Sequence, residues 1–177
     1  GPMQQGGLIQ GRTEPGAALT LDGRAVRVAA DGRFLFGFTW DFAGPARLEA
    51  RYPDGSAETR VLDVAKRQYL EQRIDGLPSS MVTPPPEVLE RIRRENAAIA
   101  AVRAQDSETP WFAGGFVWPV KGPVTGVFGS RRILNGEPRR PHFGLDIAAP
   151  EGTPVTAPAD GRVALAEPDL YFTGGTV

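Results

Sequence analysis

Short runs in which apolar and polar residues alternate fill the first third of the chain. Turn-forming residues separate these runs at Asp22-Gly23, at Asp31-Gly32 and at Pro53-Asp54-Gly55. An Asp-Gly pair between alternating runs is a strong signal for a β-hairpin, because both residues tolerate the backbone angles of a tight turn. The pattern therefore predicts three successive hairpins.

Strands at this spacing favour a small β-sandwich, similar to an immunoglobulin domain, over residues 4–64. The alternate phenylalanines Phe34, Phe36 and Phe38 are expected to form one buried face of it. The preceding Gly1-Pro2-Met3 (residues 1–3) is typical of a scar left when an expression tag is removed, and is not assigned to the fold.

The pattern changes to a helical period between about Glu87 and Gln105. Apolar residues recur there every three or four positions, directly after the prolines at 84–86. Proline suits the first turn of a helix, where its missing N–H would have no partner. We therefore expect residues 65–110 to be a connector with an amphipathic helix, whose arginines form a solvated face.

Residues 111–177 return to short apolar runs and are predicted to form a second β-rich unit. Strands are expected at 124–129, at 145–148, around Val155 and at 161–166. The sequence stops just after Gly174-Gly175, where an apparent strand begins, so this unit is expected to be cut short. The predicted fold class is mainly β.

Composition narrows the classes of function. The 177 residues carry 20 Lys and Arg against 21 Asp and Glu, a net charge of −1 that predicts no nucleic-acid partner. No apolar run approaches the roughly 18 residues of a membrane span. The absence of cysteine excludes disulfides, thiol catalysis and Cys-ligated zinc. His142 is the single histidine.

His142 and Asp146 flank the tripeptide 143–145, and both are good zinc ligands at about 2.0–2.2 Å. On an extended strand, residues four apart are separated by about 13 Å. A helix, which would bring them together, is opposed by Pro141, Gly144 and Pro150. Sharing one ion therefore requires a bend, which Gly144 permits. The spacing alone does not decide whether His142 and Asp146 bind a metal or form a hydrogen-bonded structural pair.

The stretch 122–177 resembles the lysostaphin-like (LytM-type) zinc metalloendopeptidases, which cut peptidoglycan. Four segments match that family in order: Val124-Thr125-Gly126-Val127-Phe128-Gly129-Ser130-Arg131, His142-Phe143-Gly144-Leu145-Asp146, the two hairpin segments 151–157 and 159–163, and Gly174-Gly175-Thr176-Val177. The resemblance implies the N-terminal part of an antiparallel LytM-type β-domain, a duplicated hybrid motif.

The resemblance also implies a site and a reaction. His142 and Asp146 would be two ligands of Zn²⁺, Arg131 and Asn135 are candidates for the substrate groove, and peptidoglycan stem or cross-link peptides would be cleaved. Such a substrate implies an exported protein of the periplasm or cell envelope.

The chain departs from the family at the remaining histidines. The family's third zinc ligand and its catalytic histidine lie in a later His-x-His, and this sequence has no second histidine. We therefore assign no catalytic residue here and expect the chain by itself to be inactive. Either it is part of an active enzyme whose C-terminal segment is missing or forms a separate chain, or it is a non-catalytic LytM-type module that binds or activates other cell-wall hydrolases.

Overall fold

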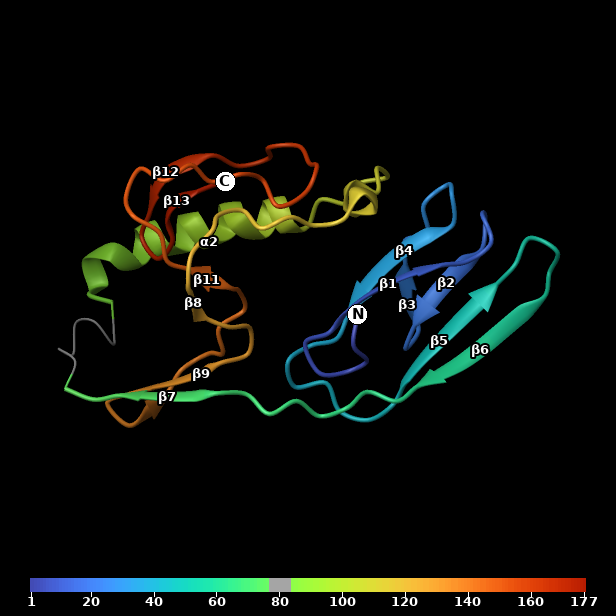
Figure 1. The fold of residues 1–177 in the computed structure, drawn as a ribbon, viewed down its shortest axis with the longest axis horizontal. Coiled ribbons are helices and arrows are strands. Elements are labelled where there is room, and N and C mark those ends of the chain that lie inside the picture. Colours follow the sequence, from blue (N-terminus) through green and yellow to red (C-terminus); the bar gives the residue numbers. More distant parts are fainter. Residues whose placement is uncertain (77–83) are drawn as a thin grey trace.

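The computed structural model describes residues 1–76 and 84–177. The chain is mainly β, as predicted, with one β-rich unit formed by its N-terminal third and a second formed by later residues (Figure 1). The α-helix α2 (Leu89–Arg103) runs behind the last strands of the second unit, and the segment after it reaches back towards the first unit.

The N-terminal unit is a two-sheet sandwich, which confirms the prediction for this region. Strands β1 and β4 form one antiparallel sheet, and the other has the order β3-β2-β5-β6. The three phenylalanines of the predicted buried face are indeed buried. The strands are β1 (Leu8–Arg12), β2 (Ala18–Leu21), β3 (Arg24–Val26), β4 (Arg33–Gly37), β5 (Ala46–Arg51) and β6 (Ala57–Leu62). The shared core is Ile9, Leu19, Phe34, Phe36, Phe38, Ala46 and Ala50.

The predicted turns form for the expected reason. Asp22 and Gly23 both have positive φ, 48° and 77°, as the tightest hairpin turn requires, and β2 pairs with β3 around them. The turn at Pro53-Asp54-Gly55 joins β5 to β6. Asp31-Gly32 also makes a tight turn, but β4 then pairs with β1, so its hairpin is reduced to the bridge between Val28 and Phe34.

The second unit consists of small sheets rather than one continuous sheet. Its sheets are β10-β9-β7, β11-β8 and β12-β13. Pairing within residues 111–177 is antiparallel, as predicted, whereas β7, which comes from the predicted connector, runs parallel to β9. The strands are β7 (Glu71–Ile74), β8 (Val124–Gly126), β9 (Arg131–Leu134), β10 (Glu137–Pro138), β11 (Asp146–Ile147), β12 (Glu167–Leu170) and β13 (Gly174–Thr176).

Strand β7 comes from the predicted connector, where the sequence has no clear period. A parallel pair needs a long crossover, and the chain between β7 and β9 supplies one that includes α2. Part of this crossover, residues 77–83, lies outside the described residues. The connector therefore contributes a strand to the second unit.

The strands predicted around Val155 and at 161–166 are wrong. Residues 148–166 contain no strand, and the next one is β12. Pro154 and Pro158 cannot donate to a strand ladder, which interrupts pairing along this segment. Isolated backbone bonds replace the ladder, such as that from the Val117 amide to the Pro158 carbonyl.

The predicted helix is confirmed as a short 3₁₀ turn, η1 (Pro86–Val88), followed by α2. A second 3₁₀ turn, η2 (Trp111–Gly114), follows the helix. Ile92 is the buried residue of α2. The predicted solvated face includes Arg93 and Arg94, which are exposed, whereas Arg91 is half-buried and pairs with Asp169.

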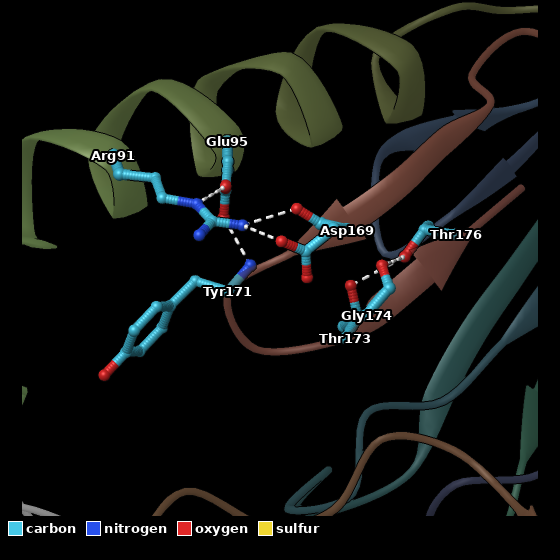
Figure 2. A network of polar contacts seen from close by, with 7 residues as sticks. All are labelled: Arg91, Glu95, Asp169, Tyr171, Thr173, Gly174 and Thr176. Atoms are coloured by element: carbon cyan, nitrogen blue, oxygen red, sulfur yellow. Dashed lines mark hydrogen bonds and ion pairs between the residues drawn. The ribbon is translucent and has the colours of Figure 1, made fainter.

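Arg91 and Glu95 fasten α2 to β12 and the turn after it (Figure 2). The Arg91 guanidinium donates to Glu95 Oε1 at 2.6 Å and to Asp169 Oδ2 at 3.0 Å. The second Glu95 oxygen accepts from the Tyr171 amide at 2.8 Å. Glu95 thus accepts from the Arg91 guanidinium of its own helix and from a backbone N–H of the turn after β12.

These bonds make a pH-dependent contribution to stability. Hydrogen bonding to Arg91, and then to the Tyr171 amide, lowers the pKa of Glu95 below its ordinary value of 4.5. A carboxylate with a depressed pKa stabilises the fold fully above its unfolded-state pKa, and this stabilisation is lost as pH falls through the folded-state pKa. Glu95→Gln should therefore lower Tm at about pH 7 and change it much less at about pH 3.

Thermal unfolding followed by circular dichroism at both pH values measures this difference. Glu90→Gln is the matched control, because among the described residues Glu90 pairs only with the equally exposed Arg93, and the substitution should change Tm little at either pH. A Tm loss for Glu95→Gln that is the same at both pH values would contradict this role.

Candidate functional site

Backbone pairing between two segments of the second unit builds the site. β8 and β11 pair with Asp146 opposite Gly126. Before β11, the Gly129 amide donates to the His142 carbonyl at 2.7 Å, and the His142 amide donates to the Ser130 carbonyl at 2.9 Å. The backbones of His142 and Asp146 are thus both held by residues 124–131, the first of the four segments that resemble the family.

The chain bends at Gly144 between these anchors, as the sequence requires if the two side chains are to meet. His142 Nε2 lies 3.1 Å from Asp146 Oδ1, compared with about 13 Å on an extended strand. The other ring nitrogen, Nδ1, faces the Val127 carbonyl at 3.3 Å. A proton on Nδ1 can be donated to that carbonyl, which leaves the Nε2 lone pair directed towards Asp146.

The donor set fits part of a zinc site. Two ligands at zinc distances and a tetrahedral angle lie about 3.3 Å apart, close to the observed separation of Nε2 and Oδ1. The imidazole is more buried than the carboxylate, which is nearly half exposed. Within residues 1–76 and 84–177, no third His, Cys, Asp or Glu joins the pair to form a metal cluster. A zinc ion here would need further ligands.

Two neighbours of Asp146 could not be placed by sequence reasoning. Arg132 Nη2 lies 3.7 Å from Asp146 Oδ2, so the two carboxylate oxygens face different groups. On the opposite strand, a Cβ at Gly126 would overlap this carboxylate. A glycine inside a predicted strand is the one sequence signal for such a close approach, whereas nothing in the sequence pairs Arg132 with Asp146.

The predicted groove residues lie on β9 and the turn that follows it. Arg131 is exposed at the start of β9, where its amide donates to the Leu70 carbonyl. Asn135, with φ of 49°, and Gly136, with φ of 80°, form the turn between β9 and β10. This turn accounts for Asn135 in the fold, and the groove assignments stay predictions.

Gly129 connects the site to the segment before β7. Its φ is 84°, and a Cβ at this position would overlap the Tyr69 ring. Tyr69 also contacts the N-terminal unit, with its ring centroid 6.2 Å from that of Trp40. The turn whose backbone holds His142 is therefore packed from the side of the first unit.

No family model matches the chain. A stretch of 99 residues, 54% of the chain, is 35% identical to the cell division protein DipM of Caulobacter vibrioides (strain NA1000 / CB15N). The chain spans about 14% of the length of that curated relative. Among the described residues, none of the helices has the length and apolarity to cross a bilayer.

The contact between Gly129 and Tyr69 predicts a difference between two glycine substitutions. Gly129→Ala meets both a left-handed backbone and the Tyr69 ring, whereas Gly136→Ala meets only the backbone term, since nothing lies near its missing Cβ. Gly129→Ala should therefore lower the free energy of unfolding by about 1–3 kcal/mol more than Gly136→Ala. Urea unfolding of both variants measures the difference, and equal losses would contradict the packing described here.

Proposed function

We propose that the chain carries part of the zinc site of a LytM-type metalloendopeptidase that hydrolyses peptide bonds in peptidoglycan stems or cross-links. The observation that carries the proposal is the convergence of His142 and Asp146 to 3.1 Å across a bend. The ordered match of four sequence segments to that family supports it, as does the similarity to a cell division protein.

The residues of this chain have distinct tasks in the proposal. His142 Nε2 and Asp146 Oδ1 would hold the metal, and the Val127 carbonyl would keep the imidazole in the tautomer that leaves Nε2 free. Arg132 lies on the Oδ2 side of Asp146, so it leaves Oδ1 on the side of His142. Zinc, when bound, supplies Lewis-acid polarisation of a peptide carbonyl and activation of water.

Two ligands do not complete a catalytic site. A catalytic zinc has three protein ligands and an open position for water, and the sequence contains no second histidine or any cysteine. In this proposal the third ligand and the proton-transferring group come from outside residues 1–177. The chain by itself is then inactive, and the complete protein acts in the periplasm or cell envelope.

The second candidate is a non-catalytic LytM-type module that binds or activates other cell-wall hydrolases. Two observations favour it: the part of the chain that the structure describes brings together only two metal donors, His142 and Asp146, and the chain is similar to a cell division protein. The two candidates differ in one property, because only the enzyme needs His142 and Asp146 as metal ligands.

Zinc content and cleavage in the complete protein separate the candidates. His142→Ala and Asp146→Asn should each reduce zinc from about one ion per molecule to near zero and abolish release of peptides from muropeptides. Metal analysis and chromatography of the digest give the two readouts. Asp63→Asn, an exposed carboxylate in the N-terminal unit, should leave both unchanged.

Full cleavage by His142→Ala would refute the enzyme assignment. A complete protein that neither holds zinc nor cleaves muropeptides, but accelerates a second wall hydrolase, would establish the non-catalytic module instead.

A further inference from the structure

A cavity of about 400 Å³ lies between the N-terminal unit and the segment that follows α2. Arg33 and Leu35 of β4 form one wall, and residues 106–112 form the other. In Figure 1 the backbone segment that follows α2 reaches towards β4. The volume is within the range of about 300–1,000 Å³ that is typical of ligand pockets, which are common between domains.

Aromatic rings form much of the second wall. Trp111, Phe112 and Phe116 all line the cavity. Trp111 is 41% exposed and Phe116 is 59% exposed. Exposed rings beside a cavity offer a flat apolar surface to a ligand at little cost in conformational entropy, because their side chains have few rotatable bonds.

An ion pair and a hydrogen bond join the two walls and leave the Asp160 carboxylate available. Arg27 Nε donates to both oxygens of Asp106, at 2.8 and 3.0 Å, and so joins the residue that follows β3 to the segment that follows α2. Arg33 donates to the Ala113 carbonyl at 3.2 Å and pairs with Asp31. Asp160, also in the lining, makes no hydrogen bond or ion pair with another of the described residues.

The charges of the lining select the class of ligand. Two arginines face three carboxylates, those of Asp106, Glu108 and Asp160, so the wall is close to electrically balanced. A phosphate would meet an unpaired carboxylate, and a lipid chain would desolvate the charged side chains. A neutral ligand with one apolar face and several hydroxyl donors satisfies both the rings and Asp160.

We propose that this cavity, which we call the inter-unit pocket, binds a neutral sugar ring of an oligosaccharide. The ring packs its C–H face on Trp111, and its hydroxyl groups donate to Asp160. The pocket includes neither His142 nor Asp146. The inference therefore goes beyond the proposed peptidase site and does not depend on it.

The test titrates the metal-free chain of residues 1–177 with the uncharged tetrasaccharide of N-acetylglucosamine, and in parallel with cellotetraose. Amide chemical shifts in NMR spectra should change at residues 106–116 and 159–160, and the affinity follows from the same titration. Trp111→Ala should weaken binding by about tenfold, and Asp160→Asn by several-fold.

Matched controls separate the pocket from other effects. Trp118→Ala removes a tryptophan that is 66% exposed and outside the lining, and should leave the affinity unchanged. His142→Ala should also bind normally, so a failed metal site is distinguished from a failed sugar site. If Trp111→Ala does not fold, Asp160→Asn decides the question, because it preserves the shape of the side chain.

Three results would overturn the proposal. The first is that neither oligosaccharide binds, and the second is that Trp118→Ala loses as much affinity as Trp111→Ala. The third is that a lysine-rich peptide binds and the sugars do not. The last result would identify the pocket as a cation site formed by the rings and carboxylates.

Discussion

The arrangement of the candidate site depends on one constraint, the antiparallel alignment of residues 142–147 with residues 124–130. The backbone bonds between His142 and the Gly129-Ser130 turn fix one end of this alignment, and the pairing of Asp146 with Gly126 fixes the other. Between them the chain must bend, so two side chains that extended backbone would separate are brought into contact. The geometry is therefore set by the backbone before any metal is considered.

The same constraint gives the N-terminal unit a structural role. The Gly129 turn is packed against Tyr69, which reaches Trp40 in the first unit. A Cβ at Gly6 would likewise overlap the Phe128 ring. β7 then continues from Tyr69 into parallel pairing with β9, the strand that begins directly after the turn. The two units thus meet beside His142 as well as at the inter-unit pocket.

Local signals predicted the features that local interactions determine. The angles at Asp22 and Gly23, the helix after the prolines at 84–86 and the bend at Gly144 all depend on residues adjacent in sequence.

The features that were missed depend on distant partners. The parallel pairing of β7 with β9 joins residues about 60 positions apart. Asp169, which pairs with Arg91, and Asp146, which pairs with Arg132, likewise lie on other elements. Val155 illustrates the opposite error, since its β-branched side chain suits a strand but the neighbouring prolines leave no ladder to join.

The central claim is that His142 and Asp146 form a metal pair through Nε2 of the imidazole. Because the sequence contains one histidine, a long-range ¹H–¹⁵N NMR spectrum of the ¹⁵N-labelled chain contains one side-chain imidazole. The account predicts that added zinc shifts the Nε2 resonance strongly while Nδ1 keeps its proton, and that Asp146→Asn weakens this response. An imidazole that is indifferent to zinc, or that binds it through Nδ1, would contradict the account.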